Sequence, residues 1–278
     1  MKVKILLPFL IFGLSSCEKF EMRGFFTSYK GVNQRFEQSI EWNRINGYYE
    51  IDLPQSTYSI YAMGDSHIGG VENLDKIFKN ARNENAAAVV MVGDLTTGHK
   101  EDYDLFSDHL PLKDSLMYFA MVGNHDLYFD GWKSFYSIFG SSTYYFVVNT
   151  SDSRDLHICL DTGDATLGEK QFDWFKKLLE TKRKSYRHCF VFTHNNLFRL
   201  RPTSSTNPIV EEIHILLDLF LKHNVSIVVT GHDHKRNTAI LGKTTHIIMD
   251  ALQDINDRAS YLKISINGIN VDYSFEEL

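Results

Sequence analysis

Five short polar segments of this sequence each follow an apolar run, and they hold the residues best suited to chemistry. They read Asp65-Ser66-His67, Asp94, Asn124-His125-Asp126, His194-Asn195 and His232-Asp233-His234. These residue types supply oxygen and imidazole nitrogen donors, and neither cysteine nor lysine is among them. Buried together without a cation, the carboxylates would repel one another and the imidazoles would lack partners. A metal centre resolves both problems.

The donor types and their number indicate which metals could bind. Mixed imidazole and carboxylate ligands suit zinc, iron or manganese. The candidate ligands are Asp65, His67, Asp94, Asn124, His194, His232 and His234. This set is too large for one ion and large enough for two, with one carboxylate bridging. We therefore expect two divalent or trivalent metal ions, whose identity stays open between Fe, Mn and Zn.

The apolar runs before these segments are typical of buried strands that alternate with helices. Continuous apolar runs such as 86–92 and 225–230 indicate strands covered on both faces. Residues 71–84 and 168–181 carry apolar side chains at helical spacing. Further helices are expected at 101–110, 131–139 and 208–223. This alternation predicts an α/β fold, in which ligands gather at the carboxyl ends of strands.

Other segments predict sheets that are not purely parallel. The strand-like runs 144–149 and 156–160 are neighbours in sequence, and the tail 236–275 reads as strands with a hairpin at Asn267-Gly268. Residues 31–57 are mixed and polar, and they could add edge strands or a small helix.

The order of the five polar segments resembles that of the calcineurin-like metallophosphoesterases. Asp-x-His, Gly-Asp, Gly-Asn-His-Asp, His and Gly-His-x-His follow one another between residues 65 and 234. The resemblance implies two mixed β-sheets packed as a sandwich and flanked by helices. It also implies hydrolysis of a phosphate ester, mono- or diester, by a hydroxide shared between two metals.

The resemblance further implies a role for each residue. Asp65, His67 and His234 would bind one metal, Asn124, His194 and His232 the other, and Asp94 would bridge them. His125 would donate a hydrogen bond or a proton to the phosphate or the leaving oxygen. Asp126 would lie behind His125 and fix its tautomer. The alternative is a non-catalytic metal-binding or interaction module at the cell envelope, although an inactive descendant would usually lack one of these residues.

Residues near the rim of the expected site depart from the family pattern or flank it. After Asp94 many members continue to another acid, where this chain has Leu95, and the segment at His194 lacks the usual proline. Substrate contacts are expected from Arg199, Arg201, His99 and Tyr128. The alternative for the two arginines is a solvated loop.

Residues 1–17 have the pattern of an exported protein. A basic start precedes a short apolar run, and Leu14-Ser15-Ser16-Cys17 resembles the lipobox of bacterial lipoproteins. The run is too short to span a bilayer. We expect a signal peptide over 1–17, a tether and N-terminal extension over 18–57, and the phosphoesterase domain over 58–278. Lipid on Cys17 would anchor the domain to a membrane of the cell envelope.

Composition limits the partners and the redox chemistry. A formal charge of −6 over 278 residues gives no electrostatic footprint for nucleic acid, so we predict no nucleic-acid-binding surface. The oligomeric state stays open. Cys159 and Cys189 lie in apolar, strand-like runs. We expect buried free thiols there, with a disulfide as the alternative.

Overall fold

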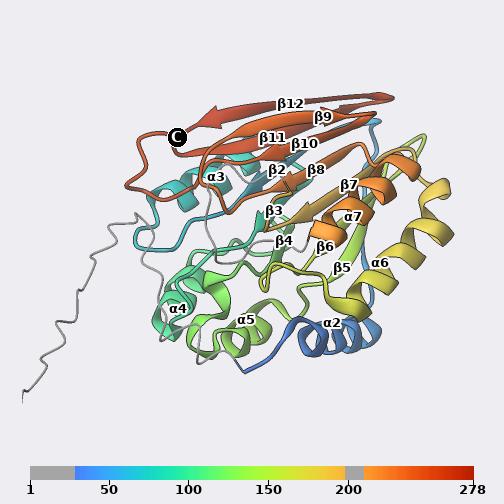
Figure 1. Ribbon diagram of the computed structural model, residues 1–278. Helices are drawn as coiled ribbons and strands as arrows, with labels where there is room; N and C mark the ends of the chain where they lie inside the picture. Colours follow the sequence, from blue (N-terminus) through green and yellow to red (C-terminus); the bar gives the residue numbers. More distant parts are fainter. Residues whose placement is uncertain (1–28, 198–209) are drawn as a thin grey trace, which may run out of the picture.

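The computed structural model consists of two β-sheets packed face to face, with helices on both outer sides (Figure 1). It describes residues 29–197 and 210–278. Both sheets mix parallel and antiparallel pairs. The predicted fold class, a mixed α/β sandwich flanked by helices, is confirmed.

The larger sheet, sheet A, has the strand order β1-β5-β6-β7-β8-β10-β9. Its strands are β1 (Tyr49–Asp52), β5 (Tyr144–Asn149), β6 (Arg154–Leu160), β7 (Cys189–Thr193), β8 (Ile227–Thr230), β9 (Asn237–Leu241) and β10 (Thr244–Ile248). The pairs β5–β6 and β9–β10 are antiparallel, and the other neighbours are parallel.

The smaller sheet, sheet B, has the order β12-β11-β2-β3-β4. Its strands are β2 (Thr57–Met63), β3 (Ala88–Val92), β4 (Tyr118–Met121), β11 (Ser260–Asn267) and β12 (Asn270–Glu277). Strands β2, β3 and β4 run parallel. The antiparallel pair β11–β12 turns at Asn267-Gly268, which confirms the predicted hairpin.

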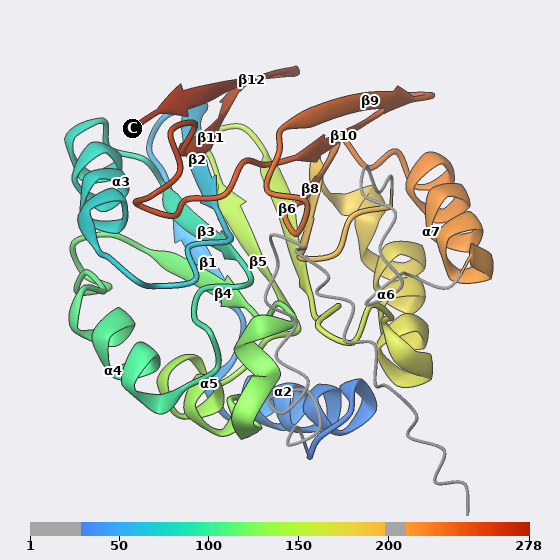
Figure 2. The same cartoon turned by 60° about the vertical axis from the view of Figure 1, so that its left-hand side comes forward.

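Helices cover the outer faces of both sheets. The α-helices are α2 (Val32–Asn46), α3 (Glu72–Asn83), α4 (Lys100–Asp108), α5 (Trp132–Phe139), α6 (Gly168–Lys182) and α7 (Val210–Lys222), with short 3-10 turns η1 (His125–Asp130) and η2 (Arg183–Ser185). Figure 2 shows α3 and α4 on the side of sheet B, and α6 and α7 on the side of sheet A. The five helices that the sequence predicted, α3 to α7, are confirmed.

The core consists of three apolar layers, one between the sheets and one under each set of helices. Between the sheets, the Phe119 and Phe146 rings stack with centroids 3.8 Å apart. Cys159 and Cys189 are buried free thiols, which confirms that expectation. No helix of the described residues is long and apolar enough to cross a membrane.

Strand direction explains how the polar segments meet. The parallel strands β2, β3 and β4 lead into Asp65, Asp94 and Asn124, so these three residues leave sheet B at one edge. The parallel strands β7 and β8 lead into His194 and His232 in the same way in sheet A. Packing the sheets face to face brings the two edges together.

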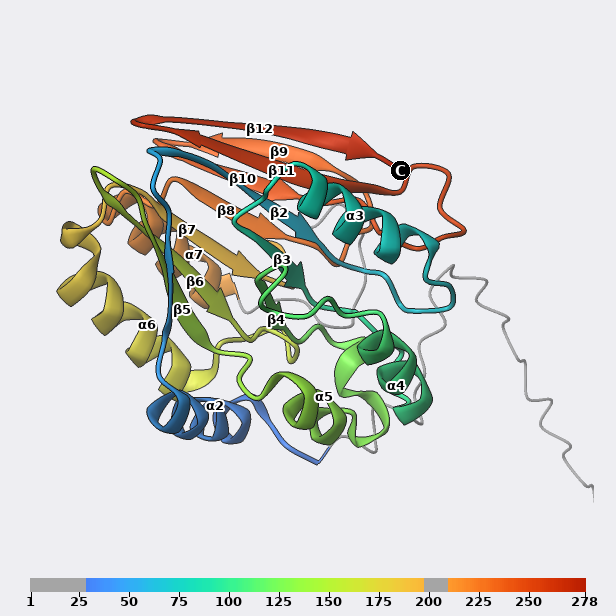
Figure 3. The same ribbon diagram turned by 180° about the vertical axis from the view of Figure 1, so that it is seen from behind.

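The described part of the N-terminal extension belongs to the fold. Residues 31–57, which we expected to add edge strands or a small helix, form the 15-residue helix α2 and the edge strand β1. Strand β1 pairs with β5 at the edge of sheet A, and Figure 3 shows α2 beside α5 from behind. Helix α2 and strand β1 therefore pack with the part of the chain that follows residue 58.

Candidate metal centre

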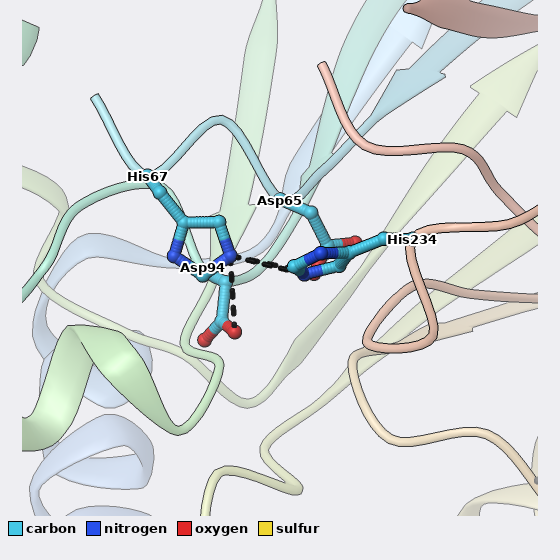
Figure 4. A group of neighbouring side chains, drawn as sticks. All are labelled: Asp65, His67, Asp94 and His234. Atoms are coloured by element: carbon cyan, nitrogen blue, oxygen red, sulfur yellow. Dashed lines mark hydrogen bonds and ion pairs between the residues drawn. The ribbon is translucent and has the colours of Figure 1, made fainter. Parts of the chain in front are cut away.

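One group of candidate ligands joins Asp65, His67, Asp94 and His234 (Figure 4). Their donor atoms all lie within 4.8 Å of one another. The Nε2 atoms of His67 and His234 are 3.1 Å apart. Asp65 Oδ1 lies 3.2 Å from His234 Nε2, and Asp94 Oδ2 lies 3.7 Å from His67 Nε2. Two carboxylates and two imidazoles thus converge, an arrangement suited to a metal ion.

A second group comprises Asp94, His194 and His232, whose donor atoms are equally close to one another. His194 Nε2 lies 3.2 Å from Asp94 Oδ2 and 3.2 Å from His232 Nδ1. The other ring nitrogen, His194 Nδ1, lies 3.0 Å from the carbonyl oxygen of Val92. A hydrogen bond from Nδ1–H to this carbonyl orients the ring and directs Nε2 into the group.

Asp94 belongs to both groups and is the residue that joins them. Its Oδ1 accepts a hydrogen bond of 2.8 Å from the backbone N–H of His125, and its Oδ2 faces His67 and His194. The side chain is almost completely buried. Asp94 therefore has the position that a bridging carboxylate requires.

Asn124 supplies a test of whether a metal fits here. Its buried side-chain oxygen, Oδ1, has no hydrogen-bond partner among the described residues. Its Nδ2 lies 3.5 Å from the hydroxyl of Tyr128. Buried polar atoms nearly always have a partner, so this oxygen needs an explanation. The role of a neutral metal ligand explains it, and the donor set therefore fits a metal.

Many of the candidate ligands share an uncommon backbone conformation. Non-glycine residues rarely adopt positive φ, because Cβ then crowds the backbone. Five ligands do so here, with φ between 40° and 73°: Asp65, His67, Asp94, His232 and His234. Such backbone strain costs about 1–3 kcal/mol per residue and clusters at functional sites.

Gly123 and Gly231 permit a close approach of the ligand carboxylates. A Cβ at Gly231 would clash with the Asp65 carboxylate, and a Cβ at Gly123 would clash with that of Asp94. Neither glycine has a positive φ among the described residues, so it is space and not backbone freedom that requires glycine here. Any side chain at either position would displace a candidate ligand.

The buried carboxylates and imidazoles of the site shift one another's pKa values. Burial opposes the charge on Asp94, but His194 and His125 outweigh it and hold the pKa of Asp94 well below its usual range. Burial also opposes the charge on His194, yet Asp94 raises the pKa of His194 to about 10. Burial lowers the pKa of His67 to about 3, although Asp94 opposes the shift. His67 is therefore neutral, whereas His194 holds a proton that must leave when a metal binds.

His125 lies beside the ligand groups without belonging to either. Its ring centroid is 4.5 Å from that of His67 and 4.8 Å from that of Tyr128. The residue is half-buried. This placement leaves the imidazole available to a substrate.

Asp126 has a different role from the one that the resemblance implied. Its Oδ2 accepts a hydrogen bond of 2.9 Å from the Gly123 N–H, and its Oδ1 accepts bonds from the backbone N–H and the hydroxyl of Thr96. Burial and the charge of Asp94 raise the pKa of Asp126 to about 7. Because both oxygens face the backbone, Asp126 ties the Asp94 loop to the Asn124 loop and does not orient His125.

The sequence model of the calcineurin-like phosphoesterase family matches residues 58–236, more than half of the chain. The chain belongs to this family. The matched range contains every candidate metal ligand, from Asp65 to His234. Membership of a phosphoesterase family supports a hydrolase whose substrate is a phosphoester.

Solved structures share the fold of this phosphoesterase at low sequence identity. A dimetal phosphatase from Danio rerio aligns with a TM-score of 0.63 at 13% identity, over 79% of this chain and 96% of its own. GAP50, described as the anchor in the inner membrane complex of Plasmodium, aligns with a TM-score of 0.62 at 13% identity, over 80% of this chain and 85% of its own. No curated protein sequence matches the chain. These likenesses show the fold alone.

The residues expected to contact substrate are placed differently from one another. Tyr128 is buried, and its hydroxyl lies next to Asn124. His99 is exposed and stacks on Phe129 with ring centroids 3.9 Å apart, at the start of α4. Arg199 and Arg201 lie outside the described residues, as does Cys17, the expected site of lipidation.

Thr96 and Thr162, which sequence reasoning did not single out, stabilise the loops that carry the candidate ligands. Thr96 donates to Asp126, as described above. The Thr162 hydroxyl lies 2.8 Å from that of Thr193 and accepts a bond of 2.9 Å from the backbone N–H of Asn195. Thr162 therefore holds the residues on both sides of His194. Neither threonine belongs to a motif, and only the tertiary structure indicates their roles.

Proposed function

We propose that this phosphoesterase hydrolyses a phosphate ester, mono- or diester, at a dinuclear metal centre. One observation carries the proposal: Asp94 is shared by two ligand groups. Asp65, His67 and His234 would hold one ion, and Asn124, His194 and His232 the other. Two bound ions would activate water as a nucleophile and neutralise the phosphate oxygens. Iron, manganese and zinc all suit these ligands.

The residues around the ligands have separate tasks in this proposal. His125 donates a proton or a hydrogen bond to the leaving oxygen, because it lies beside the groups without ligating. Asp126 keeps the loops that carry Asp94 and Asn124 at a fixed separation. Tyr128 lies against Asn124 and would help to hold that ligand in place.

The Asp94→Asn variant tests the function. An amide bridges two cations poorly, so we expect bound metal to fall below two ions per chain and hydrolysis of nitrophenyl phosphates to be lost. Asp104→Asn, an exposed aspartate on α4, is the matched control and should keep both metal and activity. Full activity of Asp94→Asn, or of metal-free protein, would contradict the proposal.

The rival function is a non-catalytic metal-binding or interaction module. The fold also occurs in GAP50, which is described as an anchor. This chain keeps a full set of ligand types together with His125, which favours the enzyme. Two tightly bound ions without turnover of monoesters, diesters, nucleotides, sugar phosphates or phospholipid headgroups would favour the module instead.

The proposal includes the place of action. Lipid on Cys17 would anchor the enzyme to a membrane of the cell envelope, since Leu14-Ser15-Ser16-Cys17 resembles a lipobox. In a bacterial host fed labelled fatty acid, the wild-type chain should acquire label and Cys17→Ala should not. Equal labelling of the two chains would exclude acylation at this residue.

A further inference from the structure

Arg35 on α2 is a charged side chain buried completely within the fold. Its Nε and Nη2 donate to the two carboxylate oxygens of Asp161 at 2.8 and 2.9 Å, a bidentate pair. Its Nη1 donates to the carbonyl oxygen of Lys30 at 2.6 Å and lies 3.3 Å from the Asp164 carboxylate. A guanidinium held in this way fixes the position of the Asp161 carboxylate.

Asp161 begins a loop, residues 161–163, that we call the bracing loop. It follows β6, whose last residue, Leu160, pairs with Thr193 of β7. Asp161 therefore lies level with His194, the residue that follows β7. The Asp161 Oδ1 also accepts a bond of 3.0 Å from the Gly163 N–H, so the carboxylate shapes the loop as well as binding Arg35.

The bracing loop adjoins the two segments that carry the candidate ligands His194 and Asn124. The Thr162 hydroxyl bonds to residues 193 and 195, on either side of His194. Gly163 packs so closely on the loop after β4 that an added Cβ would lie 3.1 Å from the Gly123 carbonyl oxygen. The loop after β4 carries Asn124. One short segment thus supports both His194 and Asn124.

We propose that Arg35 is a positioning residue for the metal held by Asn124, His194 and His232, acting through Asp161 and the bracing loop. This inference rests on the proposed dinuclear centre. Residues 58–236 match the family, so α2 lies outside the matched range. The bracing loop contacts neither Asp65 nor His67 through any hydrogen bond of the described residues, so the effect should be selective for one ion.

The test is a titration of the full chain, made metal-free, with Mn²⁺ by calorimetry. Arg35→Lys keeps the positive charge but cannot form the bidentate hydrogen bonds to Asp161. Loss of a group hydrogen-bonded directly to a ligand commonly lowers metal affinity about 10- to 100-fold. Because Arg35 acts through Asp161 and the bracing loop, we expect a loss at the low end of that range, about 10-fold, for one of the two ions, with the other binding as in the wild-type chain.

Gln38→Leu is the matched control on the same helix. Gln38 Oε1 accepts a bond of 2.7 Å from the Trp132 Nε1–H, so the variant weakens α2 docking without touching the bracing loop. It should bind both ions normally. Equal losses in Arg35→Lys and Gln38→Leu, or normal binding in Arg35→Lys, would overturn the inference.

Thr162→Val tests the role of the bracing loop if Arg35→Lys does not fold. It removes the hydroxyl between residues 193 and 195 and should weaken the same single ion. Normal binding of both ions by Thr162→Val would overturn the role of the bracing loop. A wild-type chain that binds fewer than two ions would instead contradict the proposed function, on which the inference depends.

Discussion

Asn124 illustrates at the scale of a single residue how the site trades stability for function. Its buried carbonyl oxygen has no hydrogen-bond partner among the described residues, a cost that folding alone does not explain. The positive φ of Asp94 and other ligands is a second cost of the same kind. A bound metal would offset both. The metal-free site should therefore tolerate apolar substitution better than an ordinary buried polar position.

Replacing Asn124 by leucine tests this expectation. Without metal, Asn124→Leu should unfold in urea with the wild-type free energy or with a slightly higher one, because an unpartnered oxygen is removed. The increase in melting temperature on adding Mn²⁺ should shrink. Asn43→Leu is the matched control, since the buried Nδ2 of Asn43 donates to the Thr143 carbonyl. It should lose about 1–3 kcal/mol without metal. A similar loss in both variants would contradict the assignment of Asn124 as a ligand.

His125 permits a second prediction at this scale. His125→Ala should keep both ions and lower kcat about 100- to 10,000-fold for an alkyl phosphate ester, because the leaving alkoxide needs a proton. The loss should be much smaller for a nitrophenyl ester, whose leaving group departs without protonation. Steady-state rates on the two substrates, with metal content measured in parallel, provide the comparison. Equal losses on both esters would exclude the acid role.

Asp126 shows a limit of motif-based prediction. The sequence shows that an aspartate follows His125, and the family resemblance implied that this aspartate fixes the tautomer of His125. In the structure the Asp126 carboxylate does not point at His125, because the turn after Asn124 directs it back to the Gly123 and Thr96 N–H groups. A side-chain direction of this kind depends on backbone angles that adjacent residue types do not reveal.

At the scale of secondary-structure elements, buried strands and amphipathic helices were the most predictable features. Apolar runs such as 86–92 and helical periodicity such as 71–84 report burial directly, and both became β3 and α3. Helix α2 was not predicted at its full length. Its buried face follows helical spacing but includes Arg35, Ser39 and Asn43, so hydrophobic periodicity could not reveal it. Hydrophobic periodicity does not detect buried polar side chains whose hydrogen bonds are made within the fold.

Strand β6 carries a buried histidine that predicts an acid-sensitive core. His157 lies between the rings of Phe146 and Phe190, at centroid distances of 4.6 and 4.8 Å. Neither ring nitrogen has a hydrogen-bond partner within the described part of the chain. Burial lowers the pKa of His157 from 6.5 to about 3, although Asp155 opposes the shift. The neutral ring therefore contributes stability above pH 6.5, and this contribution is lost as the pH falls toward 3.

His157→Phe should remove that sensitivity. The wild-type chain should lose on the order of 3 kcal/mol of unfolding free energy between pH 7.5 and pH 4 through this residue, and the variant should not. Urea unfolding of both chains at the two pH values, with a chelator present to exclude effects of metal, measures the difference. The same pH dependence in both chains would show that His157 does not titrate between the folded and unfolded states.

At the scale of the whole molecule, the packing of the two sheets brings their ligand-bearing edges together. Sheet B supplies Asp65, Asp94 and Asn124, and sheet A supplies His194 and His232, so neither sheet could form the centre alone. The order of the motifs allowed the fold and the ligand types to be predicted from the sequence. The support from α2 could not be predicted, because it depends on a contact between Arg35 and Asp161 across the chain.

The central claim is that hydrolysis needs two ions that share Asp94. The most direct test measures the rate of nitrophenyl phosphate hydrolysis while the metal-free chain is titrated with Mn²⁺. We predict no turnover without metal and little with one equivalent, followed by a steep rise as the second equivalent binds. Full activity after one equivalent, or activity in the metal-free chain, would contradict the account.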